Sequence, residues 1–264
     1  MNETVALVTG GSSGIGLAAA HALVRAGCKV YTISRRAFSD EAFTHLCADV
    51  TDEAAVREAV GTIITEAGKI DILVNCAGFG ISGAIEFTDL TDARRQFDVN
   101  FFGMVTCTRA VLGHMREAGH GRIVNISSVA SVVPIPFQAF YSASKAAIDS
   151  YTCALANEVR PYGVSVTAVQ PGDISTGFTD ARKKTTVGDD VYGGRIGRSV
   201  EKMERDERSG MTPEAAGAYV AKIALKKRVK PLYAIGFPHK CVCTLVSVLP
   251  CGVRNRLIYQ LYAK

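Results

Sequence analysis

The sequence lacks the features of several protein classes. It has no run of about 18 to 20 apolar residues, the length that an α-helix needs to cross a bilayer. We find no signal peptide, and the eight cysteines are scattered, so we expect a cytoplasmic protein without disulfides. The net charge of +5 comes without a concentrated basic patch, which argues against a nucleic-acid partner.

The cysteines also lack the spacing of a structural zinc site. Cys241 and Cys243, with Cys251 and His239 nearby, have no second ligand pair at a zinc-like distance along the chain. We therefore expect no metal in this protein.

Strand-like apolar segments alternate with helical segments from residue 4 to about residue 171, with no linker and no repeat. This pattern predicts the α/β class: one Rossmann-type doubly wound domain over residues 1–264, with a central parallel sheet of about seven strands and helices on both faces. The first helix should end at Gly27, and a later helix should be capped by Thr51 or Asp52. A helix near the end of the domain should begin with Thr212 as its cap and Pro213 at its first position.

Two later segments differ from this pattern. Residues 173–210 are polar, contain glycine and are densely charged, and so long a stretch inside a domain is usually functional or disordered. Residues 238–264 form an apolar extension with interspersed Arg and Lys.

A glycine loop lies between the first strand and the first helix. Gly10 and Gly14 permit a tight turn, Gly16 lets the helix pack near the strand, and the helix N-terminus presents free N–H groups to a pyrophosphate. The spacing differs from G-x-G-x-x-G, and the loop lacks the lysine of a Walker loop.

The loop, together with motifs further along, resembles the short-chain dehydrogenase/reductase family. The resemblance covers at least residues 4–176. It rests on TGGSSGIG at 9–16, Asp49-Val50, VNCAG at 74–78, DVN at 98–100, NISS at 125–128, YSASK at 141–145 and PGDIST at 171–176. Cys76 departs from the Ala or Asn that is common in the family's NNAG-like turn, and it is small enough to put little in doubt.

Tyr141 and Lys145 lie one turn apart on the same face of a helix. A nearby ammonium favours the phenolate, so we expect Lys145 to lower the pKa of Tyr141 toward neutral pH and make it an acid/base. The resemblance assigns the substrate-holding hydroxyl to Ser128, with Ser127 as the fallback. It gives Asn100 a structural and proton-relay role, although a helix-kink or capping residue is the alternative.

The resemblance also implies a cofactor site that spans the domain. Lys145 should bind the nicotinamide ribose, Asp49 and Val50 should lie at the adenine, and Thr176 should contact the carboxamide. The expected cofactor-binding residues are Gly10, Ser12, Ser13, Gly14, Ile15, Gly16, Ser34, Arg35, Arg36, Asp49, Val50, Asn75, Ala77, Gly78, Tyr141, Lys145, Pro171, Gly172, Ile174 and Thr176.

The end of the second strand bears on the choice of cofactor. An NAD site needs an acid there, and none occurs until Asp40. Arg35 can pair bidentately with a 2′-phosphate and Ser34 can add a hydrogen bond, unless Arg35 and Arg36 simply face solvent. We therefore expect NADP(H) rather than NAD(H).

The chemistry of the substrate is indicated by two segments. Residues 129–140 are apolar and suit a small lipophilic alcohol or ketone. The C-terminal run and the Phe137-to-Tyr141 segment resemble the steroid- and retinol-directed branch, which makes a hydroxysteroid dehydrogenase the first hypothesis. A 3-oxoacyl-(acyl-carrier-protein) reductase and a non-catalytic dinucleotide sensor are the alternatives.

The surroundings of the site follow from the same resemblance. Residues 173–210 occupy the position of the family's substrate lid, and a homodimer or homotetramer is implied. In the tail, Arg254, Arg256 and Lys264 flank an apolar face that suits a pocket wall, a dimer contact or a weak membrane-surface anchor.

Overall fold

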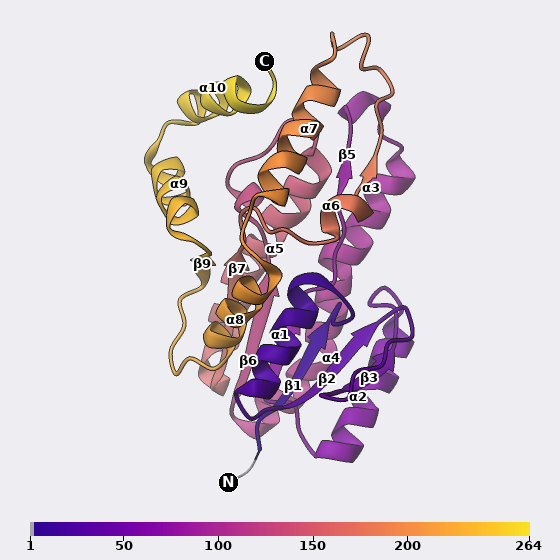
Figure 1. The fold of residues 1–264 in the computed structure, drawn as a ribbon. Coiled ribbons are helices and arrows are strands. Elements are labelled where there is room, and N and C mark those ends of the chain that lie inside the picture. The colour runs from indigo at the N-terminus through magenta and orange to yellow at the C-terminus, as the bar shows by residue number, and fades with distance from the viewer. Residues whose placement is uncertain (1–2) are drawn as a thin grey trace.

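A seven-stranded parallel sheet forms the centre of the molecule (Figure 1). The computed structural model describes residues 3–264. The strands in sheet order are β3 (Thr44–Cys47), β2 (Lys29–Ser34), β1 (Val5–Thr9), β4 (Ile72–Asn75), β6 (Gly121–Ile126), β7 (Val164–Gln170) and β9 (Leu232–Ala234). This confirms the predicted doubly wound α/β fold.

The strand order creates a switch point between β1 and β4. The chain runs outward from β1 to β3 and then returns to place β4 on the other side of β1, with Thr9 in register with Asn75. Connections leave the two strands in opposite directions there, which opens a crevice at their carboxyl ends. The glycine loop follows β1 at this edge.

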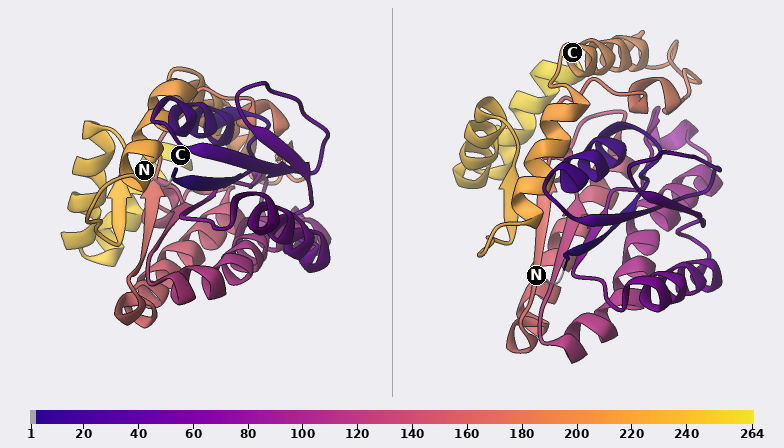
Figure 2. Two further views of the ribbon diagram at one scale, coloured as in Figure 1. Left: turned by 90° about the horizontal axis from the view of Figure 1, so that it is seen from below. Right: turned by 60° about the horizontal axis from the view of Figure 1, so that its bottom comes forward.

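Helices cover both faces of the sheet (Figure 2). Leu7 faces a layer made by α2, α4 and α5, while Val8 faces a layer made by α1 and α8. Both faces of β1 are therefore buried, as expected of a parallel sheet. These helices span Gly14–Arg25 (α1), Glu53–Ala67 (α2), Gly103–Ala118 (α4), Ala139–Glu158 (α5) and Pro213–Ala224 (α8).

The helix ends agree with the local sequence. α1 stops just before Gly27, whose φ is +83°. Asp52, rather than Thr51, caps α2 by accepting hydrogen bonds from two backbone N–H groups. Thr212 caps α8, with Pro213 at its first position.

The helical region expected from residue 89 to 119 is interrupted. It consists of α3 (Leu90–Phe97), a π-helical turn at Asp98–Phe102 and then α4. Asn100 lies within the π turn, a feature often found at functional positions. Single 3₁₀ turns occur at Ile85–Phe87, Val129–Ser131 and Arg160–Tyr162.

Residues 173–210 form an ordered unit above the sheet. They contain α6 (Phe178–Ala181), β8 (Lys183–Lys184) and α7 (Arg195–Arg208), and β8 pairs with β5 (Ile81–Ser82). The tail after β9 consists of two helices, α9 (Phe237–Val248) and α10 (Cys251–Tyr262), drawn in yellow in Figure 1. Within residues 3–264, none of the helices is long and apolar enough to span a bilayer.

Candidate functional site

The glycine loop packs tightly against the turn that follows β4. Gly10 has a φ of +68°, and a Cβ there would lie 2.9 Å from the Cα of Ala77. A Cβ at Gly16 would lie 2.4 Å from the carbonyl oxygen of Gly10. Both positions therefore require glycine. Because glycine has no side chain, nothing from these two residues covers the backbone N–H groups at the start of α1.

The start of α1 fits a pyrophosphate. Its first turn has no acidic residue, and the Ser13 side chain at the N-cap makes no capping hydrogen bond with the residues described in the structure. The backbone N–H groups in the first turn of the helix are thus available to an anion. Ser12 lies just before this turn and Ile15 lies within it. A cavity of about 440 Å³ adjoins this end of the helix and is lined by Gly14, Ser175, Thr176, Gly177, Thr179, Asp180, Arg208 and Pro213.

The carboxyl end of β4 is joined to β1 by side chains. The hydroxyl of Thr9 accepts hydrogen bonds from the N–H groups of Cys76 and Ala77, both at 3.0 Å. The Asn75 amide donates to Asn125 Oδ1 at 2.9 Å and is directed toward β6. Asn75 can therefore border a cofactor through its backbone, while Thr9, which the sequence did not single out, holds the turn in place.

The end of β2 presents two exposed arginines, Arg35 and Arg36. The Ser34 hydroxyl donates to the carbonyl oxygen of Arg36 at 3.1 Å and lies 3.3 Å from Nε2 of His45. Ser34 is thus already engaged, whereas the guanidinium of Arg35 lies in solvent at the strand end.

Asp40, the first acid after β2, points elsewhere. Its Oδ2 lies 3.1 Å from Nε2 of His21, which is two turns along α1 from the glycine loop. This contact directs the carboxylate toward the middle of the helix, away from the strand end where a ribose acid would act.

Asp49 and Val50 lie beyond β3. Partial burial acts to raise the pKa of Asp49, but hydrogen bonds from the N–H and hydroxyl of Thr51, and the charge of Arg35, outweigh it and hold the pKa below its ordinary value. Val50 is buried against the start of α4, where a Cβ at Gly103 would lie 2.5 Å from its Cγ2.

The loop after β7 lies between the 3₁₀ turn at residue 129 and the tail. The carbonyl oxygen of Pro171 accepts from the N–H of Val129 at 2.8 Å. The ring of His239 covers Gly172, and Ile174 is buried and forms a bridge with Met211. The residues from Pro171 to Thr176 thus line one side of the crevice.

Tyr141 lies in the first turn of α5, with its ring 5.7 Å from that of Phe178. Burial raises the pKa of Tyr141 to about 12, although a hydrogen bond with Ser128 acts in the opposite direction. The predicted lowering of this pKa is therefore wrong for this structure. Tyr141 is a neutral phenol at neutral pH, and the group can donate a proton to a carbonyl oxygen.

Lys145 lies one turn later and is buried. Its ammonium donates to the carbonyl oxygen of Ile126 at 2.8 Å and lies 5.6 Å from the centre of the Tyr141 ring. Burial lowers the pKa of Lys145 to about 8, while Cys76 and Asp149 act to raise it. The ammonium is directed toward the strand end rather than toward the phenol oxygen, which explains why the Tyr141 pKa is not lowered.

Ser128, rather than Ser127, faces the hydroxyl of Tyr141. The Ser127 hydroxyl is buried and donates to the carbonyl oxygen of Lys145 at 3.1 Å. Ser128 is half-buried at the start of a 3₁₀ turn, where it accepts from the N–H of Ala130 at 3.1 Å. The hydroxyls of Ser128 and Tyr141 can converge on one substrate oxygen.

Asn100 is buried beside both Lys145 and the turn after β4. Its amide accepts from the N–H of Phe79 and donates to the Phe79 carbonyl oxygen, both at 3.0 Å. A Cβ at Gly78 would lie 3.1 Å from Asn100 Oδ1 and 3.8 Å from Lys145 Nζ. Asn100 therefore holds the turn and also lies beside the lysine, so both roles considered for it are compatible with its position.

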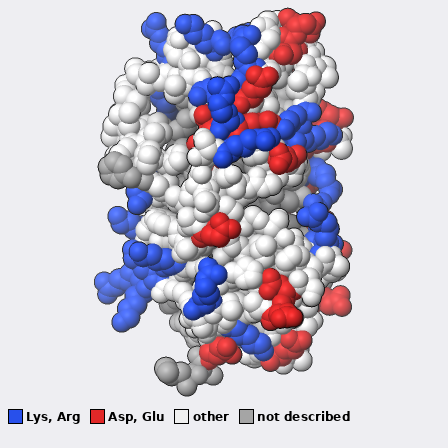
Figure 3. Space-filling model, viewed as in Figure 1, with Lys and Arg blue, Asp and Glu red and all other residues white. Residues whose placement is uncertain are grey.

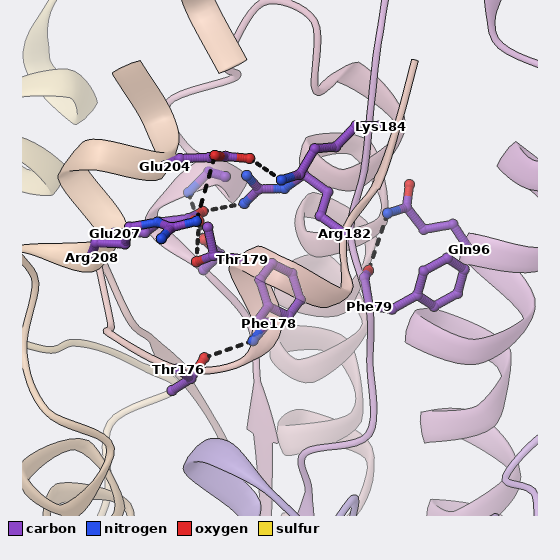
Figure 4. Close-up of polar contacts among 12 residues, drawn as sticks. Phe79, Gln96, Thr176, Phe178, Thr179, Arg182, Lys184, Glu204, Glu207 and Arg208 are labelled. Carbon is purple, nitrogen blue, oxygen red and sulfur yellow. Dashed lines mark hydrogen bonds and ion pairs between the residues drawn. The ribbon is translucent and has the colours of Figure 1, made fainter. Parts of the chain in front are cut away.

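A buried ion pair lies next to Phe178, the ring that neighbours Tyr141. Figure 4 shows the pair, Arg182 and Glu207, beside Phe178. The Arg182 guanidinium pairs with Glu207 of α7, and it lies 5.6 Å from the ring of Phe178. Thr179 donates to the other oxygen of Glu207 at 2.7 Å. Among the residues described, Nε and Nη1 of Arg182 have no hydrogen-bond partner.

Three functional candidates were missed from the sequence. Asp149 continues the face of Tyr141 and Lys145 by one turn and accepts from Gln170 at 2.7 Å, a spacing that could have revealed it. Arg182 and Glu207 are 25 residues apart in a charged segment, and no local pattern pairs them.

The comparisons with known proteins point to one family. A family model described as "short chain dehydrogenase" matches residues 4–186. A 3-ketodihydrosphingosine reductase of Bacteroides thetaiotaomicron is 42% identical over 246 residues, which cover 90% of this chain and 91% of the relative.

Solved structures agree with this match. A short-chain dehydrogenase of Streptomyces avermitilis has a TM-score of 0.84 at 31% identity, covering 97% of this chain and 95% of that one. A serine dehydrogenase complexed with NADP⁺ has a TM-score of 0.76 at 27% identity, covering 88% and 94%. Enzymes of this kind are oxidoreductases that use a nicotinamide dinucleotide, which supplies or accepts the hydride when bound. The chain is an oxidoreductase and belongs to the short-chain dehydrogenase/reductase family.

Proposed function

We propose that this enzyme reduces the ketone of a long-chain lipid with NADPH. The observation that carries the proposal is the hydroxyl of Tyr141 within hydrogen-bonding reach of Ser128, in a chain 42% identical to a 3-ketodihydrosphingosine reductase. Tyr141 gives its proton to the ketone oxygen, and Ser128 holds that oxygen in place. Lys145 binds the nicotinamide ribose, and Asn100 supports the turn beside Lys145 and relays the proton.

NADP(H) is the proposed cofactor. Arg35 lies exposed at the end of β2, while Asp40 is drawn to His21. A 2′-phosphate meets a cation there and no opposing carboxylate. The test is kcat/KM with NADPH and with NADH, in the parent enzyme and in Arg35→Ala. A preference for NADPH that collapses in the variant is expected; a preference for NADH that persists in Arg35→Ala refutes the assignment.

The substrate face is apolar. Ile135 and Phe137 pack with Ile196 and Val200 of α7, and the Phe137 ring lies 5.7 Å from that of Tyr192. Such a surface suits an alkyl chain, and a steroid nucleus is the second candidate because Phe137 and Ile135 also suit a flat hydrocarbon. We propose that residues 173–210 are the lid over this surface.

A substrate panel tests the reaction. With NADPH, 3-ketodihydrosphingosine is expected to give the highest kcat/KM, ahead of a ketosteroid and a 3-oxoacyl thioester. Faster turnover of the ketosteroid would favour a hydroxysteroid dehydrogenase, and faster turnover of the thioester would favour a 3-oxoacyl reductase. Absence of turnover across the panel, with NADPH still bound, would favour a dinucleotide sensor.

The location and the oligomeric state of the enzyme are further parts of the proposal. All eight cysteines are free thiols, in keeping with a cytoplasmic location. A homodimer or homotetramer follows from the family resemblance and is checked by sedimentation velocity.

A further inference from the structure

The charge of the chain is divided unevenly along its length. No Asp or Glu follows Glu214, and the remaining 50 residues carry nine basic ones. The part of the chain up to Glu214 holds more acidic than basic residues, although the whole chain has a net charge of +5. The nine are Lys222, Lys226, Lys227, Arg228, Lys230, Lys240, Arg254, Arg256 and Lys264.

Helix α10 has two apolar faces. Ile258 and Tyr262 lie on the face directed at the protein, and Ile258 is buried. Val253, Leu257 and Leu261 recur every four residues on another face and are 48%, 49% and 58% exposed. An apolar stripe that stays about half exposed along a helix is the pattern of a helix that meets a second surface.

Helix α9 repeats this arrangement. Val246 is buried and packs inward, whereas Val242, Leu245 and Val248 are exposed on the outer side. The surface over α9 and α10, at the upper left of Figure 3, is mostly white, with blue side chains above and below it. The two helices thus present one apolar surface with a basic border.

The tail helices are attached to the catalytic region. Tyr262 packs against α7, where Lys202 Nζ lies 5.3 Å from its ring centre. His239 of α9 covers Gly172, and its Nε2 lies 3.5 Å from Oδ2 of Asp173. One helix therefore contacts the proposed lid and the other contacts the loop that lines the crevice.

We propose that α9 and α10 dock the enzyme on an anionic lipid bilayer and hold the lid side of the site at the membrane surface. Exposed apolar side chains enter the interface, and the basic border meets lipid phosphates and acidic headgroups. A second copy of the chain is a poorer occupant, because its own tail would bring the same positive charge to the contact. The docking itself does not depend on the proposed function. Only its purpose, the delivery of a lipid ketone to the active site, rests on that function.

The first experiment measures co-sedimentation of the full-length protein with vesicles. Phosphatidylcholine vesicles are compared with vesicles that also contain phosphatidylglycerol, at low and at high salt. We expect at least about a tenfold higher partition coefficient on the anionic vesicles, reduced several-fold by salt. Equal binding to both vesicle types, or no binding to either, overturns the proposal.

Variants locate the contact. The double variant Leu245→Ser/Leu257→Ser and the double variant Arg256→Gln/Lys264→Gln should each lower anionic-vesicle binding about tenfold. Leu90→Ser, at an equally exposed leucine on α3, is the matched control and should bind like the parent protein. If the tail variants bind vesicles normally but shift the oligomeric mass, the surface joins two copies and the proposal is wrong.

An activity measurement separates this inference from the proposed function. With a short-chain, water-soluble ketone, the Leu245→Ser/Leu257→Ser variant should turn over like the parent, which also shows that it folds. With the long-chain ketone embedded in anionic vesicles, its kcat/KM should fall about tenfold. If the parent protein turns over no ketone but still binds anionic vesicles, the proposed function is contradicted and the docking surface remains supported.

Discussion

Tyr141 lies between two groups of buried polar residues that are held in different ways. On the sheet side, Asn75 and Asn100 donate and accept neutral hydrogen bonds, and Lys145 donates to a strand-end carbonyl oxygen. On the side of residues 173–210, Arg182 and Glu207 form an ion pair in which the Arg182 side chain is fully buried.

The difference shows where the site is rigid. Lys145 is tied to the end of β6 and Asn100 to the turn after β4, so the positions of both side chains follow from the fold. A buried ion pair depends on two charges that must both be present, because either one alone is costly to bury. The sheet side is thus fixed by the fold, and the other side is held by a charge pair.

The largest expected effect concerns Tyr141, the proposed proton donor, which lies between the two groups. Tyr141→Phe keeps the ring next to Phe178 and removes the hydroxyl. We expect kcat to fall by about 10² to 10⁴, the range for loss of a positioned acid, with cofactor affinity unchanged. Steady-state kinetics and NADPH fluorescence titration measure the two effects. Substantial remaining turnover would show that another group supplies the proton.

The next effect tests the ion pair as a structural element. Arg182→Met leaves the Glu207 carboxylate mostly buried and without its cation, since the Arg182 side chain is 0% exposed and that of Glu207 is 16% exposed. We expect a loss of about 3 to 5 kcal/mol in the free energy of unfolding, measured by urea denaturation.

A second variant isolates the cause. Adding Glu207→Gln to Arg182→Met removes the unpaired charge and should restore most of the lost stability. If the double variant is no more stable than the single one, the loss comes from packing at Phe178 rather than from charge.

The sheet side of Tyr141 could be predicted from the sequence to a greater extent than the side formed by residues 173–210. The motifs at Gly10, Tyr141 and Lys145 depend on local spacing. Gly10 directly follows β1, and Tyr141 and Lys145 lie in the first turns of α5, the helix that follows β6, so the fold brings both motifs to the carboxyl edge of the sheet. The seven-stranded sheet was predicted for the same reason. The alternation of strands and helices is a local signal.

Contacts between distant residues could not be predicted in this way. The Arg182–Glu207 pair depends on how α6 meets α7, and several other charges in residues 173–210 were equally plausible partners. The pKa direction of Tyr141 was missed because its burial, and the direction of the Lys145 ammonium toward Ile126, depend on tertiary packing.

The third effect concerns Lys145, on the sheet side of Tyr141, and the pH dependence of the free energy of unfolding. The pKa of Lys145 is lowered from 10.5 to about 8, so between these values the unfolded chain binds more protons than the folded one. The free energy of unfolding should therefore rise with pH from about 8 to 10.5, by about 3 kcal/mol in the parent relative to Lys145→Met. Urea denaturation across this range measures it, and parallel pH profiles would show that the lysine is not desolvated.

The smallest effect tests whether burial, rather than the number of ion pairs, holds residues 173–210. Lys184 pairs with Glu204 beside the Arg182–Glu207 pair, but its side chain is 34% exposed. Water screens this pair and competes for the ammonium, so Lys184→Met should cost less than about 1 kcal/mol, and added salt should shrink the difference further. A loss as large as that of Arg182→Met would mean that the charges act as one network. The charged side of Tyr141 would then consist of all the ion pairs between α7 and residues 182–184, and not of the Arg182–Glu207 pair alone.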